Sequence, residues 1–413
     1  MTVGKRRKGI AATAVLLGGV LTLSGCGMFG GDDDGGDDGS AAKSEISGKK
    51  DSASDARIKI TGKDGSDSAS INTGGNITVS GGKLTSVTMK AAQSGTQVEG
   101  ELAANGKSWK PKQALERATK YEVTAKAKDG EGRKAVENST FSTVSPDNSF
   151  IGTYAGEDGA KVGVGMPVSI TFDKQITNKK AVQSAIKVKS TSGQEIVGHW
   201  FGTDRLDFRP EDYWKPNTKI TVDLNLDGVK GGNGITGVQD KTVTFNVGRS
   251  QITTVDAKTY KMKVVRDGKT IKTVPISAGS AKNPTYNGKM VISEKHKETR
   301  MDGNTVGFGR KGAEGYDIKD VPHAMRLSTS GTFIHGNYWG APFGSGNTSH
   351  GCVGMKDAKG AGDSGTDGAW FYDNSLIGDV VVMKGSPDKT IQPDNGLNGW
   401  NMDWAKWKAG SAV

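Results

Sequence analysis

The sequence Thr-Phe-Ile-His-Gly at residues 332–336, followed by Ser-His-Gly-Cys-Val at residues 349–353, decides which fold and which chemistry we expect. The whole chain has only 2 Cys and 5 His, yet His335, His350 and Cys352 fall within these two stretches. A thiol attacks as its thiolate, and an ordinary pKa near ~8.5 leaves little thiolate at neutral pH. A nearby imidazole lowers that pKa by accepting the proton. The pattern therefore predicts Cys352 as a nucleophile with His335 as its base.

The local pattern indicates how these groups meet. Residues 332–335 have the pattern of a short strand that ends on His335, and a Gly/Asn-rich loop, residues 340–349, returns the chain to the Cys. Gly351 permits a sharp turn that a side chain would obstruct. Such a turn can aim the amides of residues 350–352 at one point, which predicts an oxyanion site there.

These residues resemble the signature of L,D-transpeptidases of the YkuD type, which cross-link peptidoglycan through an active-site Cys. The signature usually ends with Arg or Asn two residues after the Cys, where this chain has Gly354. The resemblance implies that Cys352 takes the acyl group of a tetrapeptide stem as a thioester and releases D-Ala. The amine of a neighbouring stem then gives a 3→3 cross-link. His335 would handle the protons, with its tautomer held by the Gly336 carbonyl, and His350 would shape the turn and tune the thiol.

The resemblance also implies a lid and a set of substrate contacts. The polar, Gly-rich residues 293–320 correspond to the family's substrate lid. Within it, residues 307–312 match a dinucleotide-binding string, but they lack the strand and helix that such a site needs, so we interpret them as a flexible part of the lid. No cofactor is implied, and carbapenem-type β-lactams are the implied inhibitors. The predicted substrate-binding residues are Met301, Tyr316, Ser330, Gly331, Trp339, Ser349 and Gly351.

The start of the chain has the pattern of an export signal. Residues 5–8 are basic and residues 10–23 are apolar, a run of ~14 that is shorter than the ~20 residues a spanning helix needs. Leu-Ser-Gly-Cys at residues 23–26 resembles a lipobox, which predicts cleavage before Cys26 and lipidation of its sulfur. The alternative is an ordinary signal peptide that happens to carry a Cys. We expect a lipid-anchored, extracytoplasmic protein that reaches into the cell wall, and residues 27–55 as a flexible linker.

Short alternating segments separated by Gly, Asp and Asn turns predict a mainly β protein. We expect two immunoglobulin-like β-sandwiches, residues 56–145 and 149–248, then a β-rich catalytic domain, residues 249–385. A Trp-rich subdomain, residues 386–413, should dock on the catalytic domain. Its Trp residues have helical spacing, which favours a packing stripe over a sugar-binding platform. The expected strands include residues 58–60, 76–79, 84–89, 121–127, 140–144, 167–172, 185–188, 205–208, 219–224, 243–247, 251–256, 261–266, 269–277 and 379–383.

Several competing interpretations remain. A net charge of +10 suits an anionic wall or membrane, but the basic residues form no pattern typical of nucleic-acid binding. A zinc site made of His335, His350 and Cys352 is disfavoured because a fourth ligand and a CxxC pair are missing from the sequence. His296 and His323 have no partner nearby in sequence and are expected to be surface or structural residues. An L,D-carboxypeptidase, a protein-anchoring transferase and a non-enzymatic wall-binding lipoprotein are the alternatives to a peptidoglycan transpeptidase.

Overall fold

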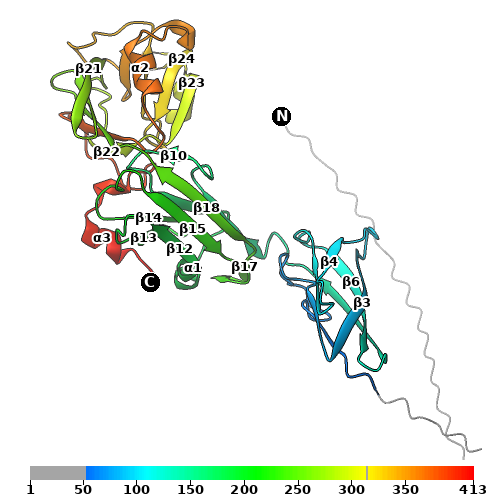
Figure 1. Ribbon diagram of the computed structural model, residues 1–413. Coiled ribbons are helices and arrows are strands. Elements are labelled where there is room, and N and C mark those ends of the chain that lie inside the picture. The colour runs from blue at the N-terminus through cyan, green and yellow to red at the C-terminus, as the bar shows by residue number, and fades with distance from the viewer. Residues whose placement is uncertain (1–52, 313–314) are drawn as a thin grey trace, which may run out of the picture. The chain divides into compact units, whose positions relative to one another are not determined.

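The structure, a computed structural model, describes residues 53–312 and 315–413 (Figure 1). The predicted lipidation residue Cys26, the signal peptide and most of the predicted linker lie outside the described residues. Strands dominate the described part and its helices are short, so the predicted mainly β fold class is confirmed. Within those same residues, no helix combines the length and the apolar character that a membrane span requires.

The first folded unit is a sandwich of one four-stranded and one three-stranded sheet around a single apolar core. Side chains alternate along the strands, as in β6, where Tyr121, Val123 and Ala125 are buried. Strand β7 begins at Lys134, before the predicted segment 140–144, because its first half lies at the sheet edge with most side chains exposed, so apolar and polar residues do not alternate there. The two sheets contain β1 (Arg57–Ile60), β2 (Ile77–Ser80), β5 (Ser108–Pro111) and β4 (Gly100–Leu102), and β3 (Gly82–Ala91), β6 (Lys120–Asp129) and β7 (Lys134–Ser142).

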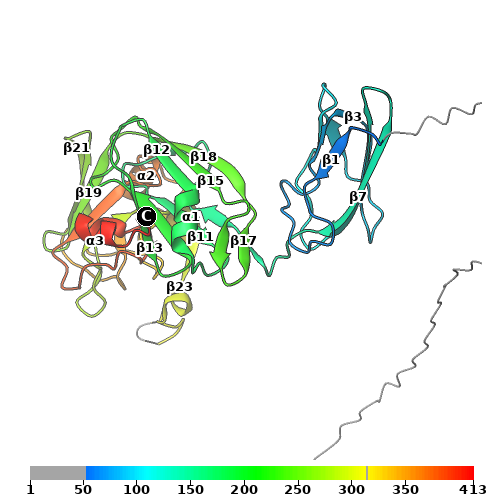
Figure 2. The ribbon, with the colours of Figure 1, turned by 90° about the horizontal axis from the view of Figure 1, so that it is seen from below.

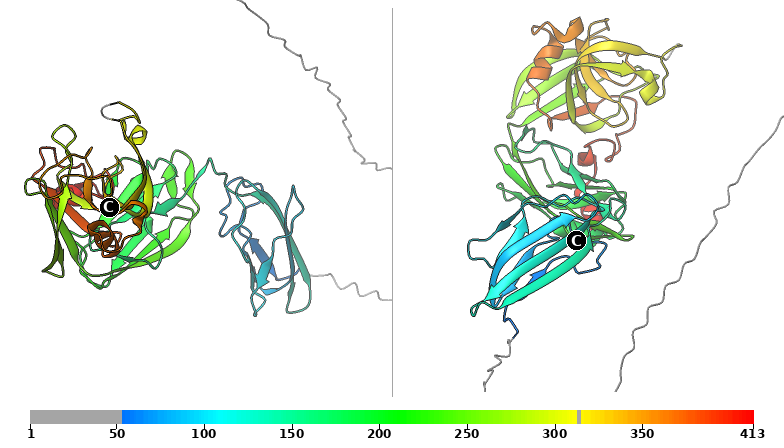
Figure 3. Two further views of the ribbon diagram at one scale, coloured as in Figure 1. Left: turned by 90° about the horizontal axis from the view of Figure 1, so that it is seen from above. Right: turned by 90° about the vertical axis from the view of Figure 1, so that its right-hand side faces the viewer.

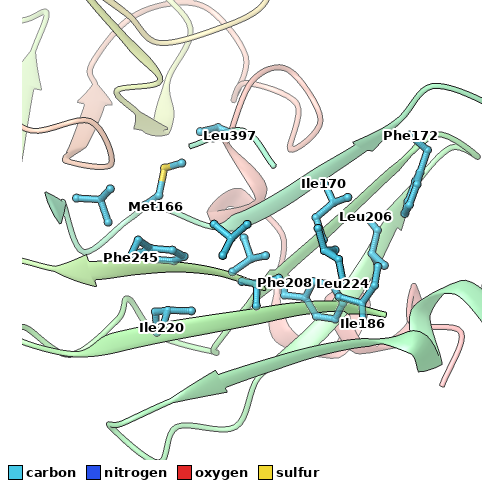
Figure 4. Close-up of a cluster of buried hydrophobic side chains, with 14 of the residues drawn as sticks. Met166, Ile170, Phe172, Ile186, Leu206, Phe208, Ile220, Leu224, Phe245 and Leu397 are labelled. Atoms are coloured by element: carbon cyan, nitrogen blue, oxygen red, sulfur yellow. The ribbon is translucent and has the colours of Figure 1, made fainter. Parts of the chain in front are cut away.

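The second unit is a sandwich of two four-stranded sheets, accompanied by a small three-stranded sheet. Figure 4 shows its core, where Ile170 and Leu206 of one sheet lie near Leu224 of the other. The sequence did not predict α1 (Lys179–Ala185), a seven-residue helix capped by the Asn178 side chain, which is too short to show a helical period. The strands are β10 (Lys161–Val162), β18 (Asp240–Val247), β15 (Lys219–Asn225) and β12 (Ile186–Ser190); β13 (Val197–Phe201), β14 (Arg205–Arg209), β11 (Val168–Phe172) and β9 (Gly152–Tyr154); and β16 (Lys230–Gly232), β17 (Ile235–Gly237) and β8 (Ser149–Phe150).

A nine-stranded sheet forms the third unit, which curls around its own core (Figure 3). Most neighbouring strands are antiparallel, but β19 pairs with β27, and β25 with β26, in parallel. Asp267 and Gly268 both have positive φ, as the predicted tight hairpin turn requires. Helix α2 (Asp367–Asp373) packs on β24, β25 and β26. In sheet order the strands are β22 (Gly288–Val291), β27 (Val380–Lys384), β19 (Gln251–Asp256), β20 (Lys261–Arg266), β21 (Lys269–Ser277), β26 (Val353–Lys356), β25 (Phe333–Asn337), β24 (Asp317–Arg326) and β23 (Glu294–Asp302).

The predicted lid, residues 293–320, is not one long loop. Residues 294–302 and 317–320 of it belong to β23 and β24, which pair in an antiparallel arrangement. The expectation was wrong because β23 is polar and half-exposed along its whole length, so its sequence carries no apolar alternation. After β23 comes the 3₁₀ helix η1 (Gly303–Val306). Figure 2 shows η1 below β23, away from the rest of the sheet.

The Trp-rich segment contacts both units: the Val291 amide of the catalytic sheet donates to Asn398 Oδ1 and Asn398 Nδ2 donates to Leu327 O, each at 2.9 Å, whereas the Trp rings lie on the second sandwich. The three Trp residues of the segment lie on η3 (Gly399–Asn401) and α3 (Trp404–Ala409), and not on one helix. The guanidinium of Arg209, on β14 of the second sandwich, lies 4.9, 5.3 and 4.2 Å from the ring centroids of Trp400, Trp404 and Trp407. The Trp400 indole donates to Gly165 O at 2.7 Å. The predicted packing role therefore holds, but the surface that the Trp rings pack against belongs to the second sandwich.

The second sandwich and the nine-stranded sheet also share an apolar core. Val291 and Val380 of the sheet pack among the buried residues of the sandwich. The two backbones touch, since the Gly163 amide donates to Ile377 O at 2.8 Å, and a Cβ on Gly163 would lie 2.3 Å from the Asp379 amide nitrogen. This close packing holds the edge of the catalytic sheet firmly on the sandwich.

Candidate active site

The parallel pairing of β25 and β26 brings the two predicted catalytic residues into one site. His335 lies opposite Gly354 in the register, and Cys352 directly precedes β26. Both line a cavity of ≈190 Å³. A larger groove of ≈500 Å³ lies on the first sandwich, but no His or Cys lines it. Other predicted residues lining the smaller cavity are Met301, Tyr316, Trp339, Ser349 and His350.

His335 is buried and held in one tautomer. Its Nδ1–H donates to the carbonyl of Gly336 at 2.7 Å, which leaves the Nε2 lone pair free to accept a proton. The indole of Trp339 stacks on the imidazole at 5.7 Å between ring centroids, although Trp339 is 42% exposed. Burial lowers the pKa of His335, and the hydrogen bond to Gly336 and the charge of Asp357 act in the opposite direction. The resting imidazole is therefore neutral and able to act as a base.

The Cys352 thiol is also neutral at rest. Burial raises its pKa to about 11, and its Sγ lies 3.7 Å from the carbonyl oxygen of Gly331, to which it donates. The sequence predicts that the imidazole lowers the pKa of the thiol, whereas burial acts in the opposite direction while the imidazole is neutral. Proton transfer from the sulfur to His335 must then accompany the attack.

The turn before the nucleophile is fixed by Ser349. Its Oγ donates to Cys352 O at 2.6 Å and accepts the Gly351 amide at 3.2 Å, and its own amide donates to Ala278 O at 3.1 Å. Gly351 has φ +109°, which a side chain would disfavour. The sequence predicted that the amides of residues 350–352 point to one oxyanion site. The Gly351 amide is instead bonded to Ser349 Oγ, so the prediction is wrong for Gly351. Ser349 holds the shape of this turn.

His350 packs under the lid. Its ring centroid lies 5.2 Å from those of Phe308 and Tyr316, and these two lid rings are 6.0 Å apart. Burial raises the pKa of Tyr316 to about 12. The lid also packs on Gly331. A Cβ on Gly331 would lie 2.3 Å from the Cγ1 of the lid residue Val306. Within the site His350 thus contacts the lid as well as bordering the thiol's cavity.

A second cavity, of ≈410 Å³, is also lined by Cys352. Met301, Tyr316 and Cys352 line both cavities, and Gly331 lines only the second. Ser330 lines neither cavity, because it is exposed and bonded to Asn395: the Ser330 amide donates to Asn395 Oδ1 at 3.0 Å, and Asn395 Nδ2 donates to Ser330 Oγ at 2.8 Å. Of the predicted substrate-binding residues, Ser330 and Gly351 line neither cavity.

Comparisons with known proteins agree with this geometry. Residues 250–383 match the family model of the L,D-transpeptidase catalytic domain, and residues 66–230 match that of a bacterial Ig domain. L,D-transpeptidase 2 of Mycobacterium tuberculosis (strain CDC 1551 / Oshkosh) is 33% identical over 351 residues, which cover 84% of this chain and 83% of that protein. The chain belongs to the L,D-transpeptidase family. The predicted family resemblance is thereby confirmed.

Two further relatives are also similar to this chain. L,D-transpeptidase 5 of Mycobacterium tuberculosis (strain ATCC 25618 / H37Rv) is 29% identical over 303 residues, which cover 71% of this chain and 64% of that protein. The structure of LD transpeptidase LdtMt1 in complex with imipenem is 26% identical, with a TM-score of 0.48 over 58% of this chain and 100% of that chain.

Sequence reasoning missed Asn337 beside the L,D-transpeptidase site. Its side chain lines the smaller cavity, and its Oδ1 accepts the Gly340 amide at 2.9 Å. A Cβ on Gly354 would lie 3.6 Å from Asn337 Nδ2, so the position where the family signature has Arg or Asn is open and adjoins an amide from the next strand. The two-residue period of β25 could have revealed Asn337, since it shares the face of His335.

The two histidines that had no predicted partner are both paired. The Nε2 of His296 lies 2.9 Å from Glu294 Oε2, on the edge strand β23. His323 is 4% exposed, and its Nδ1 lies 2.8 Å from Asp357 Oδ2. In the described part of the chain, no three His, Cys, Asp or Glu side chains form a group that could hold a metal ion.

Proposed function

We propose that this L,D-transpeptidase forms 3→3 cross-links in peptidoglycan through a thioester on Cys352. The observation that supports this most is that two cavities meet at the Cys352 side chain. A transpeptidase needs to hold a donor acyl group on its nucleophile while an acceptor amine approaches from another direction. One cavity contains the base His335 and would hold the donor, and the other would admit the acceptor.

The proposed reaction begins with a neutral pair. His335 Nε2 takes the proton of the Cys352 thiol as the sulfur attacks the carbonyl between meso-diaminopimelate and the terminal D-Ala. The C–N bond breaks, the D-Ala amine receives the proton from His335, and the acyl group remains on sulfur. The acceptor amine then attacks the thioester carbonyl, and its proton passes through His335 back to the sulfur. The Gly336 carbonyl keeps Nδ1 protonated throughout.

We also propose that carbapenem-type β-lactams acylate Cys352, on the analogy of the relative whose structure is in complex with imipenem. We further propose that the chain works outside the cytoplasmic membrane, with Cys26 lipidated and the two sandwiches carrying the active site into the wall. The predicted lipobox and the confirmed immunoglobulin-like fold support this location.

The experiment is product analysis with purified protein and a disaccharide–tetrapeptide donor. We expect a dimer that has lost one D-Ala, with the new bond joining two diaminopimelate residues. The Cys352→Ser variant should form none of it. Release of D-Ala with only tripeptide as product would instead identify an L,D-carboxypeptidase, and unchanged donor in the presence of folded protein would leave a non-enzymatic wall-binding protein.

A further inference from the structure

Asp357 is a buried carboxylate held directly behind β25. Its side chain is fully enclosed. Oδ1 accepts from the Thr366 hydroxyl and from the Ala358 amide, each at 2.8 Å, and Oδ2 lies 2.8 Å from Nδ1 of His323. A charge in such a place is costly unless it is fully hydrogen-bonded, so this arrangement is a built site and not a chance contact.

The carboxylate adjoins the peptide that orients the catalytic imidazole. A Cβ on Gly336 would lie 1.9 Å from Asp357 Oδ2, so only the absence of a side chain allows the approach. The Asp357 amide donates to the carbonyl oxygen of Asn337 at 3.1 Å, which fixes the next peptide along β25. The Gly336 carbonyl in turn accepts the Nδ1–H of His335. One residue thus touches the strand on both sides of the carbonyl that holds the imidazole.

His323 completes this site at the cost of an uncommon backbone conformation. Its φ of +51° lies in the left-handed region, which residues with a side chain seldom adopt. Its Nδ1 faces Asp357, and its ring centroid is 5.1 Å from that of Tyr372 on α2. His323 from β24, Tyr372 from α2 and His335 from β25 are the titratable groups grouped around the carboxylate.

We propose that Asp357 is a positioning residue that holds the Gly336 carbonyl toward His335 and stabilises, through its negative charge, the imidazolium formed when Cys352 loses its proton. The inference rests on the proposed function. A buried cation is poorly solvated, and a carboxylate on the far side of one peptide group supplies part of the missing stabilisation. His323 and Thr366 keep the carboxylate in place, and their contacts do not extend to the cavities at Cys352.

The test compares Asp357→Asn, which removes the charge and keeps the shape, with Asp363→Asn, which removes an exposed charge from the following loop. The readout is the rate at which a carbapenem acylates Cys352, followed by intact-protein mass spectrometry. We expect about a 10- to 100-fold lower maximal rate in Asp357→Asn, with the half-saturating concentration changed less than about threefold, and no change in Asp363→Asn. NMR titration of His335 should show its pKa lowered in Asp357→Asn.

Equal acylation rates in the wild type and a folded Asp357→Asn protein would overturn the proposal, as would an equal loss in Asp363→Asn. If Asp357→Asn does not fold, Asp357→Ser decides by the same criteria, and failure of both to fold would make Asp357 a residue of the fold alone and also overturn it. A wild-type protein that is not acylated at all would refute the proposed function instead, so the two failures are distinguishable.

Discussion

The resting charge of Cys352 is the property of this site that is most open to measurement. The structure raises the pKa of its thiol to about 11 by burial, against an ordinary value near ~8.5. At pH 7.5 the thiolate fraction is then about 0.03%, compared with about 9% for an ordinary thiol, a ratio of roughly 300. A more basic thiolate is intrinsically more nucleophilic, by roughly tenfold for this difference in pKa. We therefore expect alkylation roughly 30-fold slower than that of a free cysteine.

The assay is alkylation of Cys352 by iodoacetamide from pH 6 to pH 11.5, in a Cys26→Ser background where Cys352 is the only thiol. Circular dichroism at each pH checks that the protein stays folded. The alkylation rate should keep rising up to about pH 11. The pH at which the rate is half-maximal is the decisive quantity, because steric shielding lowers the rate equally at every pH and does not move this midpoint. The His335→Ala variant should keep this midpoint, because a neutral imidazole does not stabilise a thiolate electrostatically.

A rate that is already level below pH 7 would refute this reasoning. It would mean that the site rests as a thiolate–imidazolium pair, and the midpoint should then rise sharply in His335→Ala. Such a result would restore the interpretation that the sequence alone suggested.

Three further predictions concern packing, substrate contact and the lid. Replacing the fully buried Trp407 by Ala should lower the free energy of unfolding by about 3–5 kcal/mol, measured by denaturant titration, and a loss below about 1 kcal/mol would show that the Arg209 cluster contributes little. Gly354→Asn should fold normally, because its Cβ meets only ordinary contacts, and should lower the KM for the donor by about 2- to 10-fold through one added hydrogen bond; an unchanged or higher KM would contradict this. Phe308→Ala should raise the KM by removing the ring that packs on His350, with a smaller change in kcat, and a fall in kcat alone would argue against a substrate-holding lid.

Much of the fold was predictable from alternation and turns. The antiparallel strands β19, β20 and β21 appear at the predicted residues because Lys261, Met262, Lys263 and Val264 alternate between exposed and buried along β20 and Asp267-Gly268 supplies the turn that follows. Strand β23 was not predictable, since its side chains are polar on both faces and only its pairing with β24 makes it a strand. Alternation of apolar and polar residues indicates a strand that is buried on one face. An edge strand that is exposed on both faces has no such alternation.

The candidate site was likewise predictable from the sequence only in part. His335 and Cys352 stood out because these residue types are rare in the chain, and the pairing of β25 with β26 brings them to one cavity. Asp357 could not be predicted, because an Asp after a strand is usually a solvated turn residue and only the fold turns it inward against Gly336. The pKa of the thiol also depends on the burial of Cys352 in the fold, which the sequence does not show.

The most direct test of the account is to trap the acyl group. Purified protein would be mixed with a tetrapeptide donor at limiting acceptor, quenched in acid within seconds, and digested for mass spectrometry. We predict the mass of the stem lacking its terminal D-Ala on the peptide that carries Cys352, with the adduct lost in Cys352→Ser and strongly reduced in His335→Ala. An adduct on any other residue, or cross-linked product formed without one, would contradict the claim that Cys352 carries the acyl group.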